Sequence, residues 1–124
     1  MQQQRQRVAV VGASPKAERY SNRAVCLLKQ YGHEVVPIHP AVTLIEGLPV
    51  VPSVADLAGH VDTLTLYVSP EVSSKLAAAI VDLHPDRVIF NPGTENLALQ
   101  AILEAEGIHS LEACTLVLLQ TGQF

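Results

Sequence analysis

Short apolar segments alternate with segments of helical periodicity along the whole chain, and this alternation is the feature that most constrains the fold. Residues 7–11 form an apolar run that ends at Gly12, which is typical of a strand buried on both faces. Residues 21–31 then carry apolar side chains at helical spacing and end before Gly32. Strands separated by helices of this length form right-handed crossovers, so a parallel sheet is expected.

The same pattern repeats to the C-terminal end and predicts one Rossmann-like α/β domain over residues 7–124, after a flexible N-terminus at 1–6. We expect about five strands in a doubly wound parallel sheet, within a three-layer α/β/α arrangement of order 3-2-1-4-5 and with the first strand central. Pro37 indicates that the second strand lies at an edge or loses its pairing near its end. The strands are expected at 7–11, 34–40, 62–68, 87–90 and 108–114. The helices are expected at 21–31, after Ser53, at 69–84, from Thr94 to Gly107 and, as a short helix or turn, at 115–122.

Composition excludes several classes of protein. The residues are 48% hydrophobic and 16% charged, which excludes whole-chain disorder. The longest apolar runs are far shorter than the roughly 18 residues that cross a bilayer. The polar N-terminal residues also lack the apolar core of a secretory signal. We therefore expect a soluble, cytoplasmic protein with no membrane partner.

The net charge of −4 conceals an asymmetry along the chain. Residues 1–29 contain six of the eight Lys and Arg residues and a single acidic one, Glu18. These cations are too few for a nucleic-acid surface, so no nucleic-acid partner is expected. A compact anionic ligand near Lys16, Arg19 and Arg23 is one interpretation, and a solvated helix face is the other.

Neither a metal site nor a catalytic set is evident in the sequence. The two cysteines, Cys26 and Cys114, form no metal-ligand pattern, and no two histidines have the spacing of a zinc pair. Both cysteines are expected to be buried free thiols, although Cys114, between a strand and a helix, could instead be reactive. Ser14 has no His and Asp in a known catalytic order. We expect a protein that is not an enzyme.

Four strand ends carry distinctive loop residues, and ligands of such sheets bind at the carboxyl ends of the strands. Two of these ends place Ser or Thr at a helix start, where backbone N–H groups favour phosphate. The four ends are Gly12–Ala13–Ser14, Pro37–Ile38–His39–Pro40, Val68–Ser69–Pro70 and Asn91–Pro92–Gly93–Thr94–Glu95.

The first of these turns does not match the dinucleotide fingerprint. Gly12 occupies the first glycine position, but Ser14 and Ala17 occupy the second and third. The acidic residue that grips ribose hydroxyls at the end of the second strand is replaced by His39 and Pro40. A phosphate-bearing ribose suits this site better. An NAD(P)-binding enzyme or redox regulator is the alternative.

The segments VAVVGAS, RYSNRAV, HEVVPIHP, VSP, FNPGTEN and EACTLVLLQTGQF together resemble the small bacterial CoA-binding proteins. These are stand-alone relatives of the CoA-binding domain of the succinyl-CoA synthetase alpha subunit. The resemblance extends from about Arg7 to Phe124, with departures from the family pattern at His39, Phe90 and Asn91.

The resemblance implies binding of coenzyme A or acyl-CoA, and it implies no reaction. A sensor, a carrier, an accessory subunit docked on a CoA-dependent enzyme and a homodimer all agree with it. A domain that has lost its ligand is a weaker third interpretation. In the expected site, Lys16 and Arg19 neutralise the charge of the phosphates. The ends of the second and third strands line the space for the adenosine. The expected ligand-binding residues are Gly12, Ala13, Ser14, Lys16, Arg19, Tyr20, Ser21, Asn22, Pro37, Ile38, His39, Pro40, Val68, Ser69, Pro70, Gly93, Thr94 and Glu95.

Overall fold

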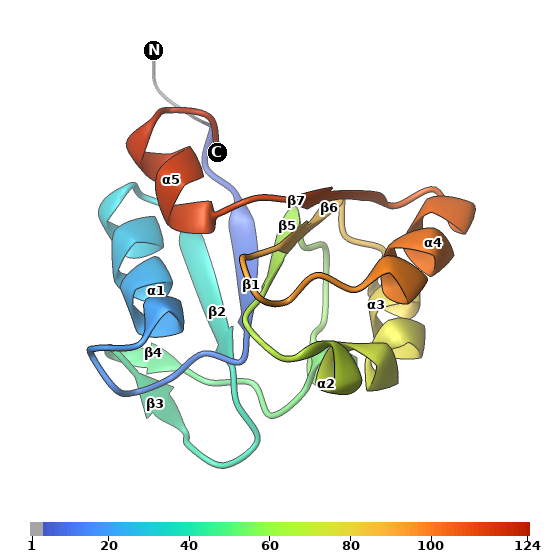
Figure 1. Ribbon diagram of the computed structural model, residues 1–124. Coiled ribbons are helices and arrows are strands. Elements are labelled where there is room, and N and C mark those ends of the chain that lie inside the picture. Colours follow the sequence, from blue (N-terminus) through green and yellow to red (C-terminus); the bar gives the residue numbers. More distant parts are fainter. Residues whose placement is uncertain (1–3) are drawn as a thin grey trace.

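A five-stranded parallel sheet lies between two helical layers in the computed structural model, which describes residues 4–124 (Figure 1). This confirms the predicted Rossmann-like α/β class. The sheet strands are β1 (Arg7–Val11), β2 (Glu34–Ile38), β5 (Thr63–Leu66), β6 (Arg87–Phe90) and β7 (His109–Glu112). The helices are α1 (Tyr20–Gln30), η1 (Val54–Asp56), α2 (Pro70–Lys75), α3 (Ala77–Leu83), α4 (Leu97–Ala105) and α5 (Thr115–Gln120).

The strand order is β2-β1-β5-β6-β7, so the predicted order is wrong. The third sheet strand pairs with β1 instead of lying outside β2. The Pro37 carbonyl accepts the Val51 N–H at 3.0 Å on the outer side of β2, and the N–H that proline lacks would face that same side. A further full strand there would miss a hydrogen bond, which keeps β2 at the edge as Pro37 predicted.

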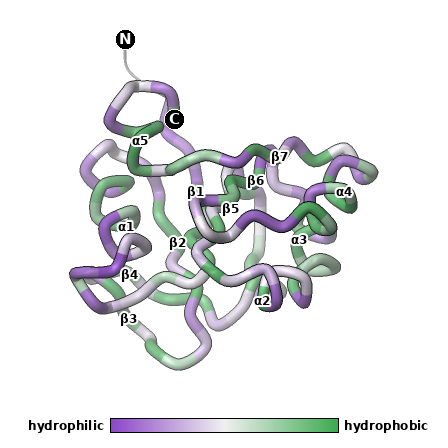
Figure 2. The backbone as a smooth tube through the Cα atoms, viewed as in Figure 1, coloured by the Kyte–Doolittle hydropathy of each residue, from purple (hydrophilic) through white to green (hydrophobic). Residues whose placement is uncertain are grey.

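β1 is an interior strand, but the middle of the five strands is β5. All four residues of β5 are buried, as a middle strand requires. Alternate residues of β1 enter two separate cores. Val8 and Val10 pack with residues of α1 and α5, whereas Ala9 and Val11 pack with residues of η1, α3 and α4. Figure 2 shows hydrophobic residues along the sheet strands.

Three local features differ from the sequence prediction. The expected helix over 69–84 is two helices, α2 and α3, that meet at Leu76. Asn96, not Thr94, caps α4, because Asn96 Oδ1 accepts the Leu99 N–H at 3.0 Å. Thr94 instead donates its hydroxyl to the Asn91 carbonyl at 2.8 Å and closes a turn. The hairpin of β3 (Leu44–Ile45) and β4 (Leu48–Pro49) was not predicted.

The expected flexible N-terminus lies partly outside the described residues, which begin at residue 4. Gln6 is held by hydrogen bonds on both sides: its N–H donates to His33 Nδ1 at 3.0 Å, and its Oε1 accepts the Thr63 hydroxyl at 2.6 Å. Within residues 4–124, no helix is both long and apolar enough to cross a bilayer.

Candidate functional site

An open groove of about 720 Å³ lies at the carboxyl ends of β1 and β5. These strands are neighbours, yet β1 continues into α1 on one face of the sheet and β5 into α2 on the other (Figure 1). Such a switch in winding direction is where doubly wound sheets bind ligands. The groove is lined by Gly12, Ala13, Ser14, Pro15, Lys16, Arg19, Tyr20, Ser21, His39, Pro40, Tyr67, Val68 and Val72.

The turn after β1 needs a glycine at position 12. Gly12 has φ of 83°, and a Cβ atom there would lie 2.7 Å from Val68 Cγ1 and 3.0 Å from the Tyr67 carbonyl oxygen. The N–H groups of Gly12 and Ala13 both donate to the Ile38 carbonyl at 3.2 Å. The turn is therefore clamped between β2 and the end of β5, which brings backbone close to the groove.

The buried Asn22 side chain fixes the part of the loop that follows Ala13. Its side-chain amide donates to the Ser14 carbonyl at 2.9 Å and to Glu46 Oε2 at 3.1 Å. The Ser14 hydroxyl accepts the Lys16 N–H at 3.1 Å. Asn22 is buried and does not line the groove, so its role in the structure is to shape the loop.

The groove is electropositive in a protein of net negative charge. Lys16 and Arg19 line it, and no acidic residue is among its lining residues. Figure 2 shows the segment between β1 and α1 as largely hydrophilic. Arg19 is the N-cap residue of α1, and no side chain caps this helix. The first N–H groups of a helix lack partners within it, so this end of the groove favours an anion.

His39 closes the groove at the end of β2. Its Nδ1 accepts the N–H groups of Ala41 at 3.0 Å and Val42 at 3.2 Å. In the neutral ring the hydrogen then sits on Nε2. Pro37 and Ile38, which precede it, are buried and do not line the groove.

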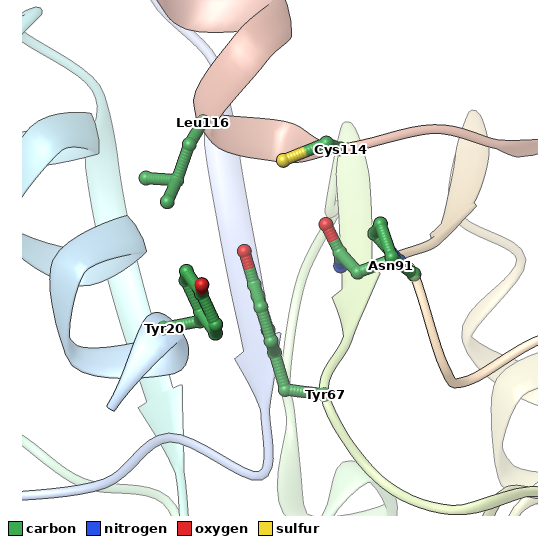
Figure 3. A pocket seen from close by; sticks show the side chains of 6 residues that line it. Tyr20, Tyr67, Asn91, Cys114 and Leu116 are labelled. Carbon is green, nitrogen blue, oxygen red and sulfur yellow. The ribbon is translucent and has the colours of Figure 1, made fainter. Parts of the chain in front are cut away.

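A second cavity of about 290 Å³ adjoins the groove (Figure 3). Tyr20 and Tyr67 line both spaces, so the two rings form the boundary between them. The other lining residues come from the end of β6 and the start of α5. They are Asn91, Pro92, Cys114 and Leu116.

A buried hydrogen-bond network fixes the far wall of this cavity. The Asn91 amide donates to Thr65 Oγ1 at 2.6 Å and to the Leu66 carbonyl at 2.8 Å. Asn91 Oδ1 accepts the Thr115 N–H at 2.9 Å, and the hydroxyls of Thr65 and Thr115 lie 2.8 Å apart. One side chain thus joins β5, β6 and α5, and it sets the position of Cys114.

Tyr67 places a buried hydroxyl at the same wall. Its oxygen has no hydrogen-bond partner within the described part of the chain. Burial raises the pKa of Tyr67 well above its ordinary value, and the neighbouring Cys114 adds to the increase. Buried hydroxyls without partners are uncommon in folded proteins.

The structure brings many of the predicted site residues together. Those that line the groove are Gly12, Ala13, Ser14, Lys16, Arg19, Tyr20, Ser21, His39, Pro40 and Val68. Those that lie outside its lining are Asn22, Pro37, Ile38, Ser69, Pro70, Gly93, Thr94 and Glu95.

The last group mostly serves local structure. Ser69 caps α2 by accepting the Val72 N–H, and Pro70 is the first residue of that helix. Thr94 and Glu95 bond within their own turn, where Glu95 Oε1 accepts the Gly93 N–H at 2.9 Å.

Sequence reasoning missed Pro15, Tyr67 and Val72 in the groove and most of the second cavity. Tyr67 directly precedes the predicted Val68, so the strand-end argument could have found it. The expectation that both cysteines are buried is wrong, because Cys26 is exposed and Cys114 half-buried. At the amino ends of β5 and β6, His60 contacts Asp62 at 3.3 Å and Asp86 at 3.1 Å, a grouping that sequence spacing did not reveal.

A protein family described as "CoA binding domain" matches residues 6–120 of the chain. An uncharacterized protein of known crystal structure is 38% identical in sequence to this chain. The two structures have a TM-score of 0.92, over 98% of this chain and 100% of that one.

Two further relatives match less closely. Uncharacterized protein YneT of Bacillus subtilis (strain 168) is 28% identical over 65 residues, 52% of this chain and 48% of that protein. The match therefore spans about half of this curated relative. Part of the dinucleotide-forming acetyl-coenzyme A synthetase 1 of Ca. Korarchaeum cryptofilum, solved with phosphate and ADP, has the same fold. It is 22% identical, with a TM-score of 0.74 over 89% of this chain and 26% of that one.

Proposed function

We propose, on the premise that this chain belongs to the CoA-binding domain family, that it binds coenzyme A or acyl-CoA in the groove at the ends of β1 and β5. The observation that carries the proposal is the charge of the groove: it contains Lys16 and Arg19 and no acidic side chain. The whole chain has a net charge of −4, so the absence of acid from this surface is not a reflection of composition.

The pyrophosphate of the ligand is assigned to the turn at Gly12, Ala13 and Ser14. That turn is clamped to the Ile38 carbonyl and lies before the uncapped first turn of α1. The N–H groups of Gly12 and Ala13 are taken by the Ile38 carbonyl, so the donors for phosphate are the unpaired N–H groups of the first turn of α1, aided by the helix dipole. Lys16 and Arg19 are exposed and form no ion pair within residues 4–124, so both are available to neutralise phosphate charge.

The adenosine is assigned to the space between His39 and Pro40 on one side and Val68 on the other. A dinucleotide enzyme of this fold places a carboxylate there, which accepts hydrogen bonds from ribose hydroxyls. Here His39 and Pro40 line that end of the groove. Coenzyme A has a phosphate on its ribose, and a carboxylate would repel it.

The role assigned to the chain is non-catalytic. Within the described residues, the groove lining contains no nucleophile paired with a base, and the Ser14 hydroxyl is engaged by the Lys16 N–H. A sensor, a carrier or an accessory subunit of a CoA-dependent enzyme agrees with such a site.

Calorimetric titration of the full chain with CoA, acetyl-CoA and NAD tests the proposal. We expect CoA to bind at least about tenfold more tightly than NAD, a difference of about 1.4 kcal/mol. A matched variant, Lys75→Ala, removes an exposed cation outside the groove and is expected to bind CoA as the wild type does. Tighter binding of NAD, or no binding of CoA, would overturn the proposal.

A further inference from the structure

The cavity beyond the two tyrosines has a chemistry different from that of the groove. The groove contains two cations, whereas the cavity is formed by two aromatic rings, Pro92, Leu116, Asn91 and a thiol (Figure 3). Because Tyr20 and Tyr67 line both spaces, a ligand anchored in the groove can extend into the cavity past these rings. A ligand that is anionic at one end and uncharged at the other fits the pair of sites.

The thiol in this cavity belongs to Cys114, and its position is fixed. Cys114 is the N-cap residue of α5, and its carbonyl accepts the Leu118 N–H at 2.9 Å. The next residue, Thr115, is fully buried and is bonded to Asn91. Cys114 itself is half-buried, and Figure 3 shows its sulfur directed into the space between Leu116 and Tyr67.

A second observation at the cavity is independent of the cysteine. The Tyr67 hydroxyl oxygen is buried and has no hydrogen-bond partner among residues 4–124. In Figure 3 this hydroxyl points toward the wall formed by Cys114 and Asn91. A polar group delivered into the cavity by a ligand would relieve the cost of leaving this hydroxyl unpaired.

We infer that the cavity receives the sulfur-bearing end of the ligand and that Cys114 there forms a mixed disulfide with coenzyme A. The inference rests on the proposed function, since it needs the nucleotide end held in the groove. The flexible arm of a ligand anchored there keeps its sulfur at a high effective concentration near the cavity.

The reaction is thiol–disulfide exchange, with the symmetrical disulfide of coenzyme A as the second reactant. The Cys114 thiol loses its proton to solvent, and the thiolate attacks the nearer sulfur of the reagent. The reagent's S–S bond breaks and a bond forms between Cys114 Sγ and one CoA sulfur. The second CoA leaves as a thiolate, so atoms and electrons balance with no other oxidant. A thiol reductant reverses the attachment.

The chain supplies its own comparison thiol in Cys26. This residue is exposed on α1 and does not line the cavity or the groove. Partial loss of water around its sulfur, together with a hydrogen bond to Glu46 and the charge of Glu46, raises the pKa of Cys26 and reduces its thiolate population. The two thiols must therefore be compared with a small neutral disulfide as well as with the CoA disulfide.

The test uses reduced full-length protein as Cys26→Ser, which retains Cys114, and as Cys114→Ser, which retains Cys26. Each variant reacts with CoA disulfide and, separately, with 2-hydroxyethyl disulfide, and intact mass under non-reducing conditions follows the rates. We expect the ratio of the Cys114 rate to the Cys26 rate to be at least about tenfold higher with CoA disulfide than with the small disulfide. An excess of a CoA analogue that lacks the thiol should slow the reaction of Cys114 with CoA disulfide and leave the reaction of Cys26 unchanged.

Equal rate ratios with the two disulfides would overturn the inference, as would a Cys114 rate unaffected by the thiol-free competitor. Calorimetry of wild-type protein with reduced CoA, in the presence of reductant, separates the two proposals. If CoA binds reversibly but Cys114 shows no preference, only this inference fails. If CoA does not bind, the proposed function fails with it.

Discussion

Gly12 and Val68 approach so closely that a Cβ atom at position 12 would lie 2.7 Å from Val68 Cγ1. This contact is where the turn after β1 meets the end of β5, and it forms the floor of the groove. The φ of 83° at Gly12 adds a backbone strain for any other residue.

We expect Gly12→Ala to lower the free energy of unfolding by about 2–3 kcal/mol and to weaken CoA binding, because the turn must move away from Val68. Gly107→Ala is the matched control: its φ is also positive, at 76°, but no atom lies within 4 Å of the added Cβ. Chemical denaturation of both variants compares the two. A Gly12→Ala protein no less stable than Gly107→Ala would contradict the close-approach argument.

Asn91 supplies the second prediction, since its side chain makes three buried hydrogen bonds between β5, β6 and α5. Asn91→Ala should lower the free energy of unfolding by about 2–3 kcal/mol, because it leaves the Thr115 N–H and the Leu66 carbonyl without these partners. Glu104→Ala, on an exposed part of α4, should change it by less than about 0.5 kcal/mol. Similar stabilities of the two variants in urea would show that the network contributes little.

His33 provides a prediction about pH. Its ring is buried, Nδ1 accepts the Gln6 N–H at 3.0 Å, and Nε2 has no partner among the described residues. Burial, with smaller contributions from Arg87 and Arg5, lowers the pKa of His33. The unfolded chain, with an ordinary histidine pKa near 6.5, then binds more protons than the folded one below that pH.

The stabilisation from neutral His33 is therefore present above about pH 6.5 and is lost as pH falls toward the folded-state pKa. Thermal unfolding of wild type and His33→Gln between pH 7.5 and 5 should show a difference in stability that shrinks on acidification. His109→Gln removes an exposed histidine and should follow the wild-type curve. A wild-type to His33→Gln difference that stays constant or grows on acidification would contradict the assignment.

The strands could be predicted from the sequence more reliably than their order. The predicted strands at 7–11 and 87–90 have the bounds of β1 and β6. A short apolar run bounded by polar or loop residues is typical of a buried strand, so its ends can be recognised in the sequence. Strand order depends on how residues 39–62 cross back over β1 to reach β5. In the sequence, this segment shows only prolines and one short helix. These features do not predict which strand pairs with β5.

The groove was largely predictable because its residues adjoin strand ends in the sequence, as Ser14, His39 and Val68 do. The second cavity was not predictable in this way. Cys114 and Leu116 reach it only because α5 packs beside α1 and the Asn91 side chain holds its first turn. Thr94 was misplaced as a helix cap because Asn96, two residues later, competes for the same role.

The central claim is that the groove holds coenzyme A through its phosphates, and one calorimetric cycle tests it most directly. The cycle measures CoA and dephospho-CoA binding to wild type, Arg19→Ala and the control Lys75→Ala. Wild type and Lys75→Ala should prefer CoA by about tenfold or more, because a charge-assisted contact to the extra phosphate contributes about 1.5–3 kcal/mol. We assign Arg19, which lines the same groove as His39 and Val68, to the phosphate on the ribose, so in Arg19→Ala this preference should largely disappear. Equal affinity of wild type for the two ligands, or a full preference retained by Arg19→Ala, would contradict the account.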